Sequence, residues 1–181
     1  MKQNIVGIVG ALVAFVSAVL PWWTMVWSAS ILGYNYSYDV SIYPYQATAS
    51  GVGISNTVSI SIWYGWVALV LVLTGGVLGI AGSLTQRTRM ILAAGGLLAL
   101  LAVVIFAVGL QNELSNTAVI GGYPILGLFS SESIYGNNYT TYLTFGFWLA
   151  LVAGIAMLVA SRIKPETNAP TTVSPPPPPP A

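Results

Sequence analysis

IWYGWVALVLVLTGGVLGIAG, residues 62–82, is followed after the segment SLTQRTR by MILAAGGLLALLAVVIFAVGL, residues 90–110. A helix rises about 1.5 Å per residue, so each run reaches about 31 Å, the thickness of the hydrocarbon core of a bilayer. The pair therefore predicts a transmembrane helical hairpin. Its turn, residues 83–89, carries Arg87 and Arg89, and basic residues in short loops are retained on the cytoplasmic side. The turn fixes the predicted orientation of the whole chain.

The composition excludes several classes of protein. The chain is 56% hydrophobic and only 5% charged, whereas soluble domains carry about 25% charged residues. Its net charge is +1 without a basic patch outside the helix flanks, which excludes nucleic acid as a partner. We therefore expect an integral membrane protein.

The sequence contains few residues that could act in catalysis or bind a metal ion. The chain contains no Cys and no His, which removes disulfides, thiol chemistry, the commonest zinc and haem ligands and the usual general base at neutral pH. The four carboxylates, Asp39, Glu113, Glu132 and Glu166, lie far apart in the sequence. We expect no catalytic residue, no metal and no cofactor, and hence no enzyme.

Residues 5–27 predict the first span, after a short cytoplasmic N-terminus of residues 1–4. Pro21 predicts a kink or the end of the regular helix, because an interior proline removes a helix hydrogen bond. An alternative interpretation treats residues 1–18 as a cleaved signal peptide, with Val16-Ser17-Ala18 as the cleavage site.

Two external segments are predicted between the spans. Residues 28–61 are polar and almost uncharged, and aromatic and β-branched residues alternate with polar ones over residues 34–42, which indicates a strand. A second alternation follows over residues 58–62. Residues 111–141 form the second segment, with a candidate strand at residues 138–143. We expect both segments to build one small antiparallel sheet, with the Tyr side of the first strand packed down on Trp22, Trp23 and the second segment.

The last span is predicted at residues 142–161 and ends at Arg162 and Lys164. The tail, residues 162–181, contains six consecutive prolines, which favour polyproline II and preclude a packed core. It is interpreted as a disordered cytoplasmic extension, with binding to an aromatic groove as the alternative. The predicted fold class is thus an all-α membrane protein, a bundle of four transmembrane helices with a small extracellular antiparallel β-sheet. We expect a multi-pass protein of the plasma membrane with both termini in the cytoplasm.

Two asymmetries support this orientation. All five basic residues fall on the predicted inner side, and all tryptophans fall in or near the outer half. Indole rings prefer the headgroup level. The predicted membrane-interface anchors are Trp22, Trp23, Trp27, Trp63, Trp66 and Trp148. The alternative role for these rings is an aromatic ligand cage.

The predicted spans contain no ionisable residue, which argues against an active transporter. They do contain small residues at a spacing of four, which allow helix backbones to approach closely. The predicted helix-packing residues are Gly75, Gly79, Gly146, Ala150 and Gly154. Packing within the bundle is the simpler interpretation, and dimerisation through one of these faces is the alternative.

Two N-glycosylation sequons, Asn35-Tyr36-Ser37 and Asn138-Tyr139-Thr140, fall on the predicted external side. Asn35 and Asn138 are therefore candidate glycosylation sites. No other residue pattern indicates a modification.

The predicted topology resembles the claudin and peripheral-myelin type of small tetraspan protein. Pro21 and Trp23 match the Pro-x-Trp pattern at the outer end of that family's first span. The family's glycine-leucine-tryptophan motif and its pair of loop cysteines are absent from this sequence. The resemblance therefore implies the tetraspan topology with a β-rich first external loop.

From these observations we expect a non-enzymatic cell-surface or accessory subunit. Its partners would be the lipid bilayer and a membrane or surface protein, which it would bind through its external sheet and its helix faces. A second copy of the same chain is one candidate for that protein partner. The alternative is a small channel, facilitator or transporter subunit, for which the polar candidates for a lining are Ser17, Thr24 and Thr74.

The orientation predicts the accessibility of a cysteine placed at Thr88, in the turn between the two central spans. Because the parent chain has no cysteine, the variant carries a single thiol. An impermeant maleimide should label it only after the cells are permeabilised. Labelling of intact cells would reverse the predicted orientation.

Overall fold

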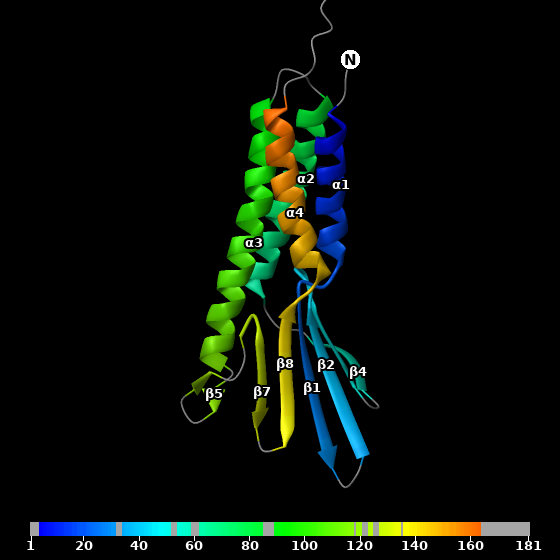
Figure 1. The fold of residues 1–181 in the computed structure, drawn as a ribbon, viewed down its shortest axis with the longest axis vertical. Helices are drawn as coiled ribbons and strands as arrows, with labels where there is room; N and C mark the ends of the chain where they lie inside the picture. Colours follow the sequence, from blue (N-terminus) through cyan, green and yellow to red (C-terminus); the bar gives the residue numbers. More distant parts are fainter. Residues whose placement is uncertain are drawn as a thin grey trace, which may run out of the picture.

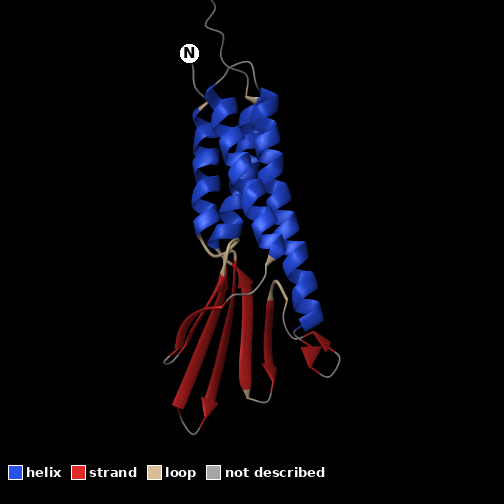
Figure 2. Ribbon diagram, turned by 180° about the vertical axis from the view of Figure 1, so that it is seen from behind, coloured by secondary structure: helices blue, strands red, loops and turns tan. Residues whose placement is uncertain are grey.

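A computed structural model describes residues 4–31, 34–51, 54–58, 62–84, 89–117, 119–120, 123–124, 127–134 and 136–163. A helical bundle stands at one end of an antiparallel sheet, and the two parts follow one another along the long axis of the molecule (Figure 1). Figure 2 shows the same division from behind.

The bundle consists of four helices: α1 (Ile5–Val19), α2 (Trp63–Leu84), α3 (Arg89–Thr117) and α4 (Phe145–Arg162). Each helix packs against two neighbours, so that their order around the bundle is α1, α2, α3, α4 and back to α1. The helices α2, α3 and α4 are long and apolar enough to cross a membrane, and α1 is a shorter apolar helix. α1 begins and α4 ends at the end of the bundle that lies away from the sheet (Figure 1).

Small residues form the closest contacts between helices inside the bundle, beside larger buried side chains such as Val72, Phe106 and Met157. A Cβ atom added to Gly75 would lie 2.7 Å from the Gly95 carbonyl oxygen, and one added to Gly95 would lie 2.6 Å from the Gly75 oxygen. α3 and α4 approach each other equally closely, because a Cβ atom added to Gly96 would lie 2.8 Å from the Gly154 carbonyl oxygen. Only residues without a side chain allow these helix axes to approach so closely.

Large aliphatic side chains lie on the outside of the bundle instead. The exposed ones include Ile5, Val9, Leu12, Val16, Val70, Val77, Leu97, Leu101, Val104, Val108, Val152, Ile155 and Val159. An aliphatic surface together with close helix contacts at glycine is typical of helices that associate in lipid, because no hydrophobic drive brings them together there. The packing thus agrees with the membrane-spanning length of the helices.

Asn4 joins three helices at the end of the bundle away from the sheet. Its side-chain oxygen accepts a hydrogen bond from the Gly7 amide at 3.2 Å and caps α1. Its side-chain nitrogen donates to the Ala160 carbonyl of α4 at 2.8 Å. Its backbone amide donates to the Ser83 carbonyl of α2 at 3.2 Å. One asparagine therefore hydrogen-bonds to backbone groups at the ends of α1, α2 and α4 and ties the three helices together.

At the other end, α1 stops before Pro21 and the chain turns directly into the sheet. The indole of Trp22 is buried and donates to the Ser17 carbonyl at 2.8 Å. Its ring meets Phe106 of α3 edge-on, with centroids 4.9 Å apart. The Trp22 carbonyl accepts from the Thr144 amide, and the Pro21 carbonyl accepts from the Gly146 amide, each at 3.0 Å. We call this cluster, Pro21, Trp22, Thr144 and Gly146, the junction.

The main sheet has six antiparallel strands in the order β4-β3-β2-β1-β8-β7. Their bounds are β1 (Trp23–Ile31), β2 (Tyr34–Ile42), β3 (Ala47–Gly51), β4 (Ile54–Val58), β7 (Ser130–Ile134) and β8 (Asn137–Leu143). A separate two-stranded hairpin, β5 (Val119–Ile120) and β6 (Tyr123–Pro124), follows the end of α3. The prediction of one antiparallel sheet built from both predicted external segments is confirmed.

The first predicted span is corrected by the structure. Residues 5–27 were expected to continue as one apolar span, but the helix ends at Val19 and Trp23 begins β1. The physical reason is Pro21, which ends the helix, together with the alternation of apolar and polar residues from Trp23 to Ile31. α3 is longer than predicted and reaches Thr117.

Other boundaries differ less. β2 has the predicted bounds of residues 34–42, and β8 begins one residue before the predicted strand at 138–143. The second alternation was placed at residues 58–62, whereas β4 ends at Val58, and residues 59–61 lie outside the described part. The turn at 85–88 and the tail from residue 164 lie outside it as well.

Gly79 gives a test of the bundle core. A Cβ atom at Gly79 would collide with the Met157 sulfur and would lie 2.9 Å from the Ala11 Cβ. Gly79→Leu should therefore lower the free energy of unfolding by about 3 kcal/mol, as overpacked cores do, and lower the melting temperature in detergent. Val77→Leu, at an exposed position of the same helix, is the matched control. Equal melting of both variants would show that the Gly79 side of α2 is not packed.

Candidate functional site

The sheet has two sides of different chemistry. In an antiparallel pair, residues directly opposite one another project from the same side of the sheet, and successive residues alternate between the sides. The register pairs Trp27 with Tyr38 on β2 and with Tyr139 on β8. It also pairs Val26 with Asp39 and Thr140. Every described side chain of the sheet can be assigned to one side in this way.

One side collects most of the rings and is named here the aromatic face. It consists of Trp23, Met25, Trp27, Ala29, Tyr34, Tyr36, Tyr38, Val40, Ile42, Ala47, Ala49, Gly51, Ser130, Glu132, Asn137, Tyr139, Thr141 and Leu143. A single row across five strands runs Gly51, Tyr38, Trp27, Tyr139 and Glu132. Three adjacent aromatic residues thus occupy the middle of this face.

Gly51 makes room for the first ring of that row. A Cβ atom at this position would lie 2.7 Å from Tyr38 Cδ2 and 3.1 Å from the Ser37 carbonyl oxygen. The tyrosine ring therefore lies over the glycine on the neighbouring strand. An aromatic side chain that covers a glycine on the adjacent strand is a known way to fix the register of a sheet.

The aromatic face is covered near the bundle and open further out. Trp23 is 2% exposed, and its indole donates to the Gly127 carbonyl at 3.3 Å. Thr141 is buried and donates to the same carbonyl at 2.8 Å. By contrast Tyr36 is 40% and Tyr34 72% exposed. The described chain thus leaves an apolar, aromatic surface uncovered at the outer end of the sheet.

The expected packing of the tyrosines is wrong only for the bundle end. Tyr34, Tyr36 and Tyr38 were predicted to pack on Trp22, Trp23 and the second external segment. Tyr38 does share a row with Tyr139 of that segment, but β2 runs away from the bundle toward Tyr34 (Figure 1). The reason is the register: Ile42, at the other end of β2, pairs with Trp23. The tyrosines are consequently the part of β2 that is furthest from the helices.

The opposite side, named the polar face, carries mostly hydroxyl and amide groups. It consists of Thr24, Val26, Ser28, Ser30, Asn35, Ser37, Asp39, Ser41, Thr48, Ser50, Ser131, Ser133, Asn138, Thr140 and Tyr142. The hydroxyls of Thr24 and Ser41 lie 3.1 Å apart. Both sequon asparagines, Asn35 and Asn138, belong to this face and are exposed.

The predicted helix-packing residues all lie inside the bundle. Gly75, Gly79, Gly146, Ala150 and Gly154 are buried, and Gly146 is packed against the junction, where a Cβ atom would lie 2.5 Å from Trp22 Cδ1. These faces contact other helices of the same chain. They are therefore not free for dimerisation in this structure.

The six predicted interface anchors separate into two groups. Trp63 and Trp66 on α2 and Trp148 on α4 are exposed where the bundle meets the sheet. Trp22 and Trp23 are buried in the protein, and Trp27 is half-buried on the aromatic face. The anchor prediction is thus corrected for Trp22 and Trp23, which are buried in the protein, and it stays a prediction for Trp27.

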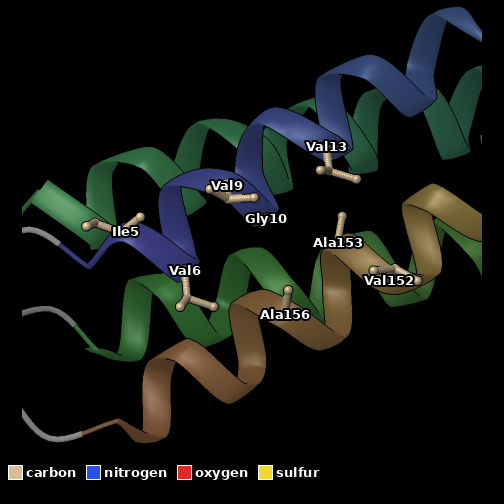
Figure 3. Close-up of a pocket in the computed structure, with 8 residues that line it drawn as sticks. All are labelled: Ile5, Val6, Val9, Gly10, Val13, Val152, Ala153 and Ala156. Carbon is tan, nitrogen blue, oxygen red and sulfur yellow. The ribbon is translucent and has the colours of Figure 1, made fainter.

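An apolar cavity of about 230 Å³ lies between α1 and α4 (Figure 3). Its lining includes Val6, Val9 and Gly10 of α1 and Val152, Ala153 and Ala156 of α4. The lining offers no polar side chain to orient a substrate. Among the described residues no group of three His, Cys, Asp or Glu side chains could hold a metal ion.

The chain matches no protein-family model, and no curated protein is significantly similar to it. The site must therefore be interpreted from its own geometry.

Sequence patterns missed β1 and with it the centre of the site. In the stretch WTMVWSASI, residues 23–31, apolar and polar residues largely alternate, but residues 23–27 were predicted to belong to the first span because of their high hydropathy. This alternation indicates a strand that has Trp23, Met25 and Trp27 on one face. Asn4 was missed too, although Asn before an apolar helix is a common N-cap.

Residue-resolved amide exchange tests the sheet. Residues 38–42 of β2 are paired on both sides, by β1 and β3, whereas residues 34–37 are paired with β1 alone over the described range. Amides 38–42 should therefore exchange more slowly than amides 34–37. Tyr36→Ser should leave the protection of 38–42 unchanged, because the ring is exposed. Equal and rapid exchange over residues 34–42 would show that the loop is unstructured.

Proposed function

We propose that the protein is a multi-pass plasma-membrane protein that binds another membrane or surface protein through the aromatic face of its external sheet. The observation that carries the proposal is the half-buried row of Tyr38, Trp27 and Tyr139 beside the exposed Tyr34 and Tyr36 at the outer end of the sheet. The proposal includes a fourth span formed by the short helix α1.

Placement in the membrane is supported by the surface of the bundle. Its outer face is aliphatic, and exposed aromatic residues gather at the sheet end, where α2 and α4 begin: Trp63, Trp66, Phe145 and Trp148. Arg89 and Arg162 lie at the opposite end of α3 and α4. Aromatic residues at one boundary and basic residues at the other are typical of a bundle whose basic end faces the cytoplasm.

Protein binding is supported by the chemistry of the aromatic face. Tyrosine and tryptophan give large contact areas at a low cost in conformational entropy, and they are enriched at protein interfaces. Only the outer end of the aromatic face exposes such side chains among the described residues, at Tyr34 and Tyr36. A flat array of this kind suits a protein surface better than a small molecule, which requires a concave site.

The alternative of a channel or facilitator gains no support from the described bundle. The Ser17 hydroxyl is buried and donates to the Ala14 carbonyl at 2.7 Å. Thr74 is exposed on the outside of α2, and Thr24 belongs to the sheet. These three candidates for a pore lining therefore do not share one path. The resemblance to claudin-type tetraspan proteins remains part of the proposal at the level of topology.

Site-specific photo-crosslinking tests the binding face. A benzoylphenylalanine at Tyr36, on the aromatic face, is compared with one at Asp39, on the polar face of the same strand; both positions are exposed. In intact cells of the native source, position 36 should give a discrete adduct several-fold stronger than position 39. Trp27→Ser should weaken that adduct.

The opposite pattern would contradict the proposal. Equal adducts from both positions would indicate non-specific collisions, and an adduct from position 39 alone would assign binding to the polar face. Purification of the cross-linked complex in detergent then gives the stoichiometry and separates a second copy of this chain from a different protein.

A further inference from the structure

We infer that the polar face of the sheet is the glycan-bearing face of the protein, with Asn35 as the principal N-glycosylation site and Asn138 as a second site on the same face. This inference rests on the proposed external position of the sheet. It adds a covalent modification, and it explains why the two faces differ in composition.

The register places both sequons on one side. Asn35 pairs with Ser30, and Asn138 pairs with Ser28. Residues 28 and 30 of β1 have the same parity, so the two asparagines project from the same side of the sheet. The acceptor side chains and the hydroxyl residues of the sequons, Ser37 and Thr140, are all exposed.

The two positions are close enough to cover one surface together. β8 and β2 flank β1 on either side. At about 4.8 Å between strands and about 3.3 Å per residue, the two Cα atoms lie roughly 12 Å apart. Two oligosaccharides at this spacing would cover much of the hydroxyl-rich side and would leave the aromatic face uncovered.

The middle residue of each sequon shows the division of the faces. Tyr36 and Tyr139 lie between the acceptor asparagine and the hydroxyl residue, and both belong to the aromatic face. In each sequon the asparagine and the hydroxyl residue therefore project from the polar face, and the tyrosine between them projects from the aromatic face. Glycosylation at these sites leaves the aromatic rings free to bind a protein.

The reaction requires a polyprenyl-diphosphate-linked oligosaccharide and a membrane-bound oligosaccharyltransferase. The amide nitrogen Nδ2 of the asparagine forms a bond to the anomeric carbon of the sugar. The bond from that carbon to the diphosphate oxygen breaks, and the diphosphate leaves with the electron pair. One amide proton is lost to the base of the transferase, so the step needs no oxidant or reductant.

The length of chain between each asparagine and a helix of the bundle predicts which of the two sites is glycosylated more often. The transferase acts on the extended chain at the membrane, before the sheet forms. Asn35 follows the end of α1 by roughly 16 residues, about 50 Å of extended chain, whereas Asn138 precedes α4 by roughly 7 residues, about 23 Å. Asn35 has the longer tether, and we expect a higher occupancy there.

The test is expression of the full chain in a glycosylating eukaryotic cell line, followed by digestion with a peptide N-glycosidase. The parent chain should lose mass on digestion. Asn35→Gln should remove most of the glycosylated form. Ser37→Ala should do the same while it retains Asn35, which separates loss of the sequon from an effect of the asparagine itself. Asn138→Gln should remove a smaller fraction.

The outcomes are read together with the labelling of the cysteine at Thr88 in the same cells. An unmodified parent chain whose Thr88 cysteine is labelled only after permeabilisation overturns this inference and leaves the proposed function intact. An unmodified chain labelled from outside overturns both. A chain modified mainly at Asn138 contradicts the ranking by tether length and supports the glycan-bearing polar face.

Discussion

The structure depends on the hydrogen bonds of Pro21 and Trp22, where four segments of the chain meet. The Trp22 amide donates to the Ile42 carbonyl at 2.8 Å, and the Trp22 carbonyl accepts from Thr144. The Pro21 carbonyl accepts from the Gly146 amide and from the Thr144 hydroxyl. The end of α1, both central strands and the start of α4 are thereby joined at one point. Because the indole of Trp22 also packs on Phe106 and Phe147, the sheet direction is fixed by the bundle core.

This attachment explains how a single-layer sheet persists without a disulfide. A small sheet alone buries too little apolar surface to offset the entropy of its ordered chain. Here the row nearest the bundle, including Trp23, Ile42 and Leu143, is buried together with the helical core. Helix assembly fixes the ends of both loops, which lowers the entropy cost of closing them. The outer end of the sheet can therefore carry exposed residues on both faces, such as Tyr36 and Ser37.

Much of the helical hairpin and of the sheet was predictable from sequence, and the errors have a common cause. Hydropathy identified α2, α3 and α4, and alternation identified β2 and β8, because each segment has one dominant pattern. β1 carries two patterns at once: its residues are apolar enough for a span and alternate as a strand. Burial against the bundle end explains the hydropathy of Trp23. The side on which Tyr36 lies depends on pairing with Ala29, which a single strand's sequence does not specify.

The distribution of hydrogen bonds also supports the proposal that recognition belongs to the sheet rather than to the bundle. The hydroxyls of Ser17, Ser83 and Ser161 each donate to a carbonyl of their own helix, and no buried side-chain nitrogen or oxygen lacks a partner in the described part of the chain. A bundle whose polar groups are already paired offers little to discriminate one ligand from another. The sheet differs, because its outer aromatic residues and its exposed amides have no such internal role. Specificity is therefore expected where the chain combines exposed rings with a rigid, register-fixed backbone.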